Sequence, residues 1–125
     1  MNSQPLLGTA EEILGYAEEE FRKALKLKDT LLYRNAADKA FLALVLAVNA
    51  LIASKTGLTP RSHYERRRIL REIGREDLRA IYSDLMRTLH EEAFYEGVFN
   101  PEEVEYAIRK VRGIIEEIKR EIAGS

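Results

Sequence analysis

The chain has 125 residues, a length that predicts a single domain over residues 1–125 with a hydrophobic core of its own. Lysine and arginine total 20 and aspartate and glutamate total 21, so the net charge of −1 gives no bulk attraction to nucleic acid or to an anionic membrane. No cysteine is present, which excludes disulfides, thiolate zinc sites and cysteine nucleophiles.

The first predicted helix covers residues 9–28. Thr9 followed by Glu12 matches a capping box, in which a threonine oxygen accepts from an amide of the first turn and the glutamate reaches back. We therefore expect the ordered core of the domain to run from about residue 9 to about residue 123. No basic stretch followed by an apolar stretch precedes this helix, so we expect no signal peptide and a cytoplasmic location.

The second predicted helix begins at the cap Asp29, is apolar on almost every side, and ends at Gly57. Its apolar run over residues 40–53 is interrupted by Asn49 and is shorter than the roughly 20 residues that a membrane span needs. We expect the central helix of a bundle, no membrane partner, and a hydrogen bond from another helix to the Asn49 amide.

Three more helices complete the predicted fold. Ser62 and Glu65 form a second capping box, and the helix that they open is followed by one over residues 76–96. Gly97 ends that helix, and Asn100 caps the last one. Short connections favour antiparallel neighbours. The predicted fold class is therefore all-α, an up-and-down bundle of about five helices.

Metal and cofactor motifs are absent from the sequence. Di-iron bundles use Glu-x-x-His, but Pro60 and Arg87 stand three residues before the two histidines, His63 and His90. The zinc motif His-Glu-x-x-His fails because Phe94 stands where its second histidine is needed. There is no glycine-rich dinucleotide motif and no P-loop. We predict neither a metal nor a cofactor.

The most basic segment, residues 61–79, holds seven arginines against four acidic residues. Arg67, Arg71 and Arg75 recur every four residues and form one stripe if the helix is continuous through them. A guanidinium group can donate two hydrogen bonds at once to the oxygens of a phosphate. These three residues and Arg61 are therefore candidate phosphate-binding residues. The alternative is a solvated helix face whose arginines pair with neighbouring glutamates.

The two histidines are the other candidates. Arg87 lies three residues before His90, which places both on one turn of a helix. A histidine can transfer protons while an arginine holds the scissile phosphate of RNA, so His90 and Arg87 form a candidate catalytic pair. The alternative for His90 is packing at a helix or subunit interface. We expect His63 to be neutral, because it lies at a helix N-terminus, and we group it with Tyr95 as a polar cluster.

Three segments carry a family resemblance, and the last of them is the most specific. They are NAADKAFLALVLAVNAL (residues 35–51), SHYERRRIL (62–70) and LHEEAFYEG (89–97). With these segments the chain resembles the archaeal PaREP repeat-associated proteins, within the wider HEPN-like superfamily of nucleotide-binding helical bundles, over residues 11–118. The resemblance implies a bundle that dimerises and, for many members of the superfamily, RNA cleavage or another nucleotide-related role.

Active ribonucleases of that superfamily place four to six residues between a catalytic arginine and its histidine, and often have asparagine after the arginine. His90 matches the histidine, but only two residues separate it from Arg87, and Thr88 follows that arginine. We expect a cytoplasmic homodimer that engages nucleotide or RNA phosphates, or a partner protein. The alternatives are a toxin-like, metal-independent ribonuclease using His90 and Arg87, and a structural partner without a ligand. The charged share of 33% favours a heat-adapted source.

Overall fold

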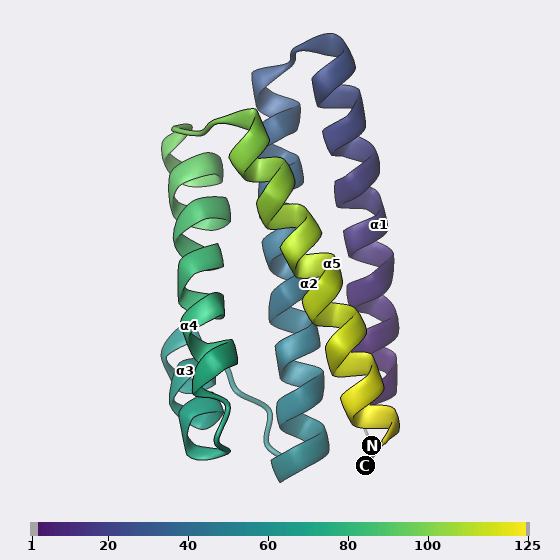
Figure 1. The fold of residues 1–125 in the computed structure, drawn as a ribbon, viewed down its shortest axis with the longest axis vertical. Coiled ribbons are helices and arrows are strands. Elements are labelled where there is room, and N and C mark those ends of the chain that lie inside the picture. The colour runs from purple at the N-terminus through teal and green to yellow at the C-terminus, as the bar shows by residue number, and fades with distance from the viewer. Residues whose placement is uncertain (1–2, 125) are drawn as a thin grey trace.

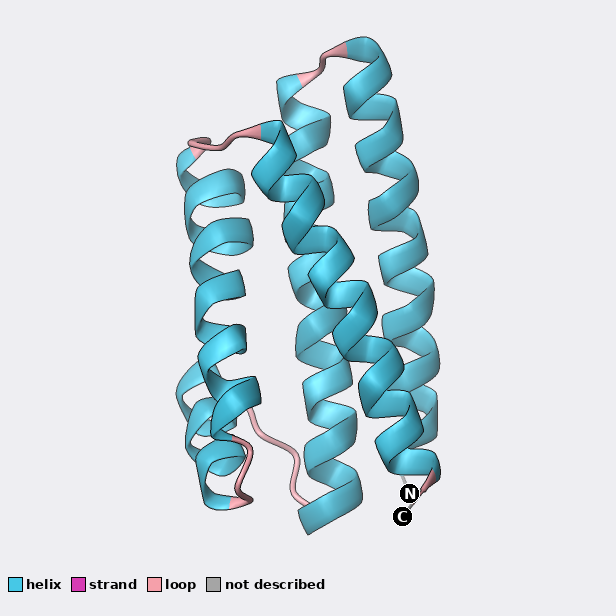
Figure 2. Cartoon of the chain, in the orientation of Figure 1, coloured by secondary structure: helices cyan, strands magenta, loops and turns pink. Residues whose placement is uncertain are grey.

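The computed structural model describes residues 3–124 as an all-helical bundle, so residues 1–2 and 125 of the predicted domain lie outside it (Figures 1 and 2). The helices are α1 (Ser3–Leu27), α2 (Thr30–Thr56), α3 (His63–Glu72), α4 (Glu76–Leu85), η1 (Met86–Glu96) and α5 (Pro101–Ala123). The long helices run alternately up and down, and both chain ends lie at the same end of the bundle (Figure 1). The predicted all-α, up-and-down fold is confirmed. α4 and η1 are continuous and together form the fourth of the five predicted helices, which we call the α4–η1 rod.

The hairpin of α1 and α2 is packed through small residues. α1 buries alanines completely at seven-residue intervals, and α2 buries six alanines completely on the faces it turns to its neighbours. These residues are Ala10, Ala17 and Ala24 on α1, and Ala36, Ala37, Ala40, Ala43, Ala47 and Ala50 on α2. Because alanine side chains are short, the two helix axes can approach closely. The buried alanines therefore allow α1 and α2 to form a closely packed hairpin.

The predicted start of the first helix is wrong. α1 begins at Ser3 and not at a cap on Thr9, and the Thr9 hydroxyl donates to the carbonyl of Pro5, 3.0 Å away. This is the bond that a threonine inside a helix makes to the preceding turn. Pro5 is tolerated because it lies in the first turn, where its missing N–H would have no helical partner.

α2 is the central helix, since it contacts α1, α3, η1 and α5. It is the one helix in the described chain that is long and apolar enough to cross a membrane by length and composition, but 72% of its most apolar window is buried inside the bundle. Such burial is typical of the core helix of a globular bundle. The predicted cross-helix hydrogen bond of Asn49 is confirmed, because its Oδ1 accepts from Arg66 Nε of α3 at 2.7 Å.

The other predicted helix boundaries are largely confirmed. Asp29, Ser62 and Asn100 cap α2, α3 and α5 by accepting hydrogen bonds from backbone amides of the first turn. The Glu65 carboxylate reaches back to the amide of Arg61 at 3.0 Å. Gly57 and Gly97 end their helices at positive φ, a conformation that glycine adopts without strain.

The helix predicted over residues 76–96 has two geometries. Its second half, η1, is a π-helix, in which hydrogen bonds join residues five apart. Arg34 of α2 holds the end of η1, because its Nη2 donates to the carbonyl oxygens of Phe94 at 2.7 Å and Tyr95 at 3.2 Å. A Cβ at Gly97 would lie 3.1 Å from the Arg34 guanidinium, so glycine there makes room for this contact. We refer to Arg34 and these carbonyls as the α2–η1 clamp.

Candidate functional site

The two histidines meet, although they are 27 positions apart in the sequence. His63 lies in the first turn of α3 and His90 lies on η1, and their ring centroids are 6.2 Å apart. Phe41 of α2 lies against both, with its ring centroid 5.5 Å from each imidazole. The site therefore forms where α3 and η1 converge on the middle of α2.

His90 is oriented by α2. Its Nδ1 lies 2.8 Å from Asp38 Oδ1, and its ring stacks with Phe41 and with Phe94, at interplanar angles of 23° and 12°. An ionised carboxylate can only accept a hydrogen bond, so Nδ1 carries the proton and Nε2 of the neutral ring is an acceptor. This arrangement is suited to a general base.

His63 has the opposite tautomer. Its Nδ1 lies 2.7 Å from the hydroxyl of Tyr82 and 3.3 Å from Arg66 Nη1. A guanidinium can only donate, so Nδ1 accepts and the proton of the neutral ring resides on Nε2. Burial, followed by the positive charge of Arg66, lowers the pKa of His63 below its usual value of 6.5. The neutral state that the sequence predicted is therefore the favoured one, and the tyrosine keeps its proton because burial raises the pKa of Tyr82.

Arg66 is a buried cation without an acid. The residue is only 9% exposed. Its Nε donates a hydrogen bond to Asn49 and its Nη1 donates one to His63. Among residues 3–124, no carboxylate lies within ion-pairing distance of it. Buried charges in proteins are normally paired, so this guanidinium gives the site a positive charge that only neutral groups offset.

Two adjoining cavities share the histidines as lining residues, and together we call them the histidine cleft. The arginine lobe, about 420 Å³, is lined by Arg61, Arg66, Asp38 and Phe41 among others. The glutamate lobe, about 520 Å³, is lined by the remaining residues Arg67, Met86, Glu91, Tyr95 and Glu96. The cleft thus joins a predominantly basic lobe to one that contains two carboxylates, an aromatic ring and one arginine.

The predicted phosphate-binding arginines separate into two groups. Arg61 and Arg67 line the histidine cleft, one in each lobe. Arg71 pairs with Glu76 at 3.4 Å, and Arg75, whose side chain is 17% exposed, is bound by Asp77, Glu117 and Glu121. The condition for a continuous stripe, an unbroken helix through Arg75, is therefore not met. α3 ends at Glu72, and the chain turns at Gly74, where φ is +79°.

The structure does not bring Arg87 to His90. Arg87 pairs with Asp84 at 3.4 Å, one turn earlier on the exposed side, and it does not line either lobe of the histidine cleft. On an α-helix, side chains three residues apart are neighbours. Arg87 and His90 lie on η1, whose π-helical turn is wider, so this rule does not apply to them. The group that lies beside the histidines is Arg66, which takes the place expected for Arg87. Tyr95 does line the cleft with His63, as predicted for the polar cluster.

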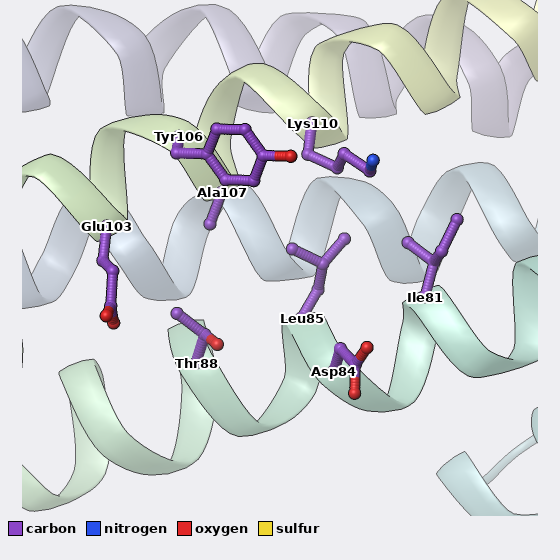
Figure 3. Close-up of a pocket in the computed structure, with 8 residues that line it drawn as sticks. All are labelled: Ile81, Asp84, Leu85, Thr88, Glu103, Tyr106, Ala107 and Lys110. Atoms are coloured by element: carbon purple, nitrogen blue, oxygen red, sulfur yellow. The ribbon is translucent and has the colours of Figure 1, made fainter.

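A separate pocket of about 290 Å³ lies between the α4–η1 rod and α5 (Figure 3). Leu85 and Ala107 face each other across it, while Asp84, Glu103 and Lys110 lie at its margins (Figure 3). It has no histidine or arginine and is not part of the histidine cleft. Within residues 3–124, no group of three or more metal-ligating side chains converges at this pocket or elsewhere.

A comparison with protein-family models gives one match, the archaeal PaREP1/PaREP8 family, over residues 12–115. That segment covers more than half of the chain and includes every residue of the histidine cleft. The chain belongs to the archaeal PaREP1/PaREP8 family. No curated protein and no solved structure matches it.

In this PaREP1/PaREP8 chain, sequence reasoning missed Asp38, Phe41 and Arg66 as site residues. Asp38 and Phe41 belong to the segment that carries the family resemblance, but an acid at the edge of an apolar helix gave no signal of what it would face. Arg66 is the first of three consecutive arginines, and only the tertiary packing shows which of them is buried. A helical-wheel comparison with Ile69 and Leu70, which share its face, could have found it.

Proposed function

We propose that this protein binds phosphate-bearing ligands, either a nucleotide or single-stranded RNA, in the histidine cleft. The observation that carries the proposal is the buried Arg66 without an acidic partner beside two histidines. An anion that enters the arginine lobe would provide the missing countercharge. A phosphate suits this role because guanidinium groups donate to its oxygens in pairs.

Two further observations support a phosphate over a carboxylate or a neutral ligand. Arg61 lines the same lobe as Arg66, so two guanidiniums and two imidazoles surround one cavity. The neutral His63 carries a proton on Nε2, which adds a third donor group to the two guanidiniums without adding charge. Among the residues that line the arginine lobe, only Asp38 is acidic, and its carboxylate accepts a hydrogen bond from His90.

Fluorescence anisotropy with a labelled RNA hexamer tests the proposal. Affinity is expected to fall steeply with added salt because phosphate contacts release counterions. Arg61→Gln and Arg67→Gln should each weaken binding about three- to tenfold, since one lost contact of this kind is worth about 1 kcal/mol or slightly more. Arg71→Gln and Arg87→Gln are matched controls that remove the same charge outside the cleft, and they should bind as the parent does. Equal losses in all four variants would contradict a defined site.

A second candidate function is metal-independent cleavage of RNA. The Asp38–His90 contact favours it, because it leaves an imidazole nitrogen positioned as a general base beside a guanidinium. His90 and His63 would then carry proton transfer, and Arg66 would hold the scissile phosphate in place of Arg87. Cleavage should persist in EDTA and be lost in His90→Ala, while Arg87→Ala remains active. RNA that stays intact after long incubation at high protein concentration would exclude the reaction and leave a binding module.

We also propose a cytoplasmic homodimer, on the strength of the resemblance to HEPN-like bundles. Sedimentation at micromolar concentration tests the dimer, and a single monomeric species would contradict it. If neither RNA nor a nucleotide binds, the remaining candidate function is that of a structural partner protein without a small ligand.

A further inference from the structure

We infer that the glutamate lobe of the histidine cleft is a base-recognition subsite that prefers guanine. This inference rests on the proposed function, because it needs a phosphate in the arginine lobe. The two lobes share His63 and His90, so a nucleotide with its phosphate against Arg66 can extend its base past the histidines into the second lobe.

The π-helical geometry of η1 assembles this lobe. In an α-helix the neighbours along one face are three and four residues apart, whereas hydrogen bonds of a π-helix join residues five apart. Glu91 therefore has both Tyr95 and Glu96 beside it on η1, and all three line the same cavity. In an α-helix Glu96 would be rotated away from Glu91.

An exposed aromatic ring provides a stacking surface. Tyr95 is 77% exposed, although its backbone is fixed through the Arg34 contact to its carbonyl. A tyrosine ring on a held backbone can stack against any base, and such stacking is insensitive to sequence. Met86 lies in the same lobe and adds a polarisable apolar contact.

The carboxylates supply the specificity. Glu91 and Glu96 line the glutamate lobe and have no hydrogen-bond or ion-pair partner among the side chains of residues 3–124. Carboxylates accept hydrogen bonds without donating them. Guanine presents two adjacent donors, N1–H and the exocyclic N2–H, that match the two oxygens of one carboxylate. Adenine and cytosine each pair one amino donor with a ring nitrogen acceptor, which a carboxylate repels. The negative charges also direct the phosphate to the other lobe.

Isothermal titration with guanosine and inosine 5′-monophosphates tests the inference, because inosine lacks only the exocyclic amino group. The parent protein should bind the guanosine nucleotide about tenfold more tightly, which corresponds to one charge-assisted hydrogen bond. The variant Glu91→Gln/Glu96→Gln should bind both nucleotides equally. Glu116→Gln, which removes a carboxylate from the exposed surface of α5, should keep the preference.

A second measurement isolates stacking. Tyr95→Ala should weaken both nucleotides about tenfold and leave ribose 5-phosphate, which has no base, unchanged. If the parent binds both nucleotides equally, or if the double variant retains the preference, the inference is wrong while the proposed phosphate site stands. If neither the nucleotides nor ribose 5-phosphate binds, the proposed function itself fails.

Discussion

The α1–α2 hairpin and the edge formed by α3 and η1 are built on opposite principles. The hairpin is closed by alanines and large aliphatic residues, most of which have no exposed surface. α3 buries only Arg66, Ile69 and Leu70, and η1 buries only Leu89 and Ala93. One region is therefore an apolar scaffold, and the other presents charged and aromatic side chains over it.

The difference shows why the candidate site lies where it does. α2 contributes Asp38, Phe41 and Asn49 from a helix whose other faces are fixed by the core. The edge contributes the histidines and Arg66. A site at this seam combines a rigid wall with side chains that can still face solvent, which is the arrangement that precise ligand positioning requires.

The largest expected effect is loss of stability in the scaffold. Leu44→Ala on α2 should lower the free energy of unfolding by about 4 kcal/mol, near the upper part of the range for buried leucines, because its surroundings cannot collapse around the cavity. Ile69→Ala on α3 should cost about 2 kcal/mol, since α3 can shift toward the gap. Chemical denaturation measures both. Equal losses would show that the edge is as tightly packed as the hairpin.

The α2–η1 clamp tests how far the scaffold controls the edge. Arg34→Met removes a charged donor from two carbonyls and should lower the free energy of unfolding by about 1.5–2 kcal/mol. It should also speed amide exchange in residues 86–98 while α1 stays protected. Arg109→Met is the control, because Arg109 makes only an exposed pair with Glu105 and should change stability by less than about 0.5 kcal/mol. Uniform exchange through the whole chain would contradict a local role.

The fold was predictable because its signals are local. Caps at Asp29, Ser62 and Asn100 act within one turn of the chain, and the apolar pattern of α2 reports its central position directly. Thr9 misled because a threonine followed by a glutamate also occurs inside helices, where its hydroxyl bonds to the preceding turn.

The site was predictable only in part, because it depends on tertiary contacts. His63, His90, Tyr95, Arg61 and Arg67 were recognised as candidates and line the histidine cleft. No local signal in the sequence marked the π-helix, and the contact that Arg34 makes with its end joins residues 60 positions apart. Without it, spacing rules for an α-helix paired His90 with the wrong arginine.

A smaller effect is expected from pH. The pKa of His63 is lower in the folded protein than its unfolded value of 6.5, so the folded state binds fewer protons below that pH. This residue therefore costs no stability above pH 6.5 and lowers stability as pH falls through 6.5 toward the folded pKa. His63→Gln should make the loss of stability between pH 7.5 and pH 5.5 smaller than in the parent, measured by denaturation at both values. An unchanged or larger loss would show that the imidazole is not disfavoured as a cation.

The positive charge of Arg66 and the two imidazoles form the proposed anion site, and NMR titration of the histidines tests this site most directly. Sulfate keeps its charge across this pH range and can stand in for a phosphate, with chloride at matched ionic strength as the control. Bound sulfate should raise the pKa of His63 relative to chloride, because a nearby anion favours the protonated ring, and should shift the His90 resonances. Identical titration curves for both histidines in sulfate and chloride would show that no anion binds at this site.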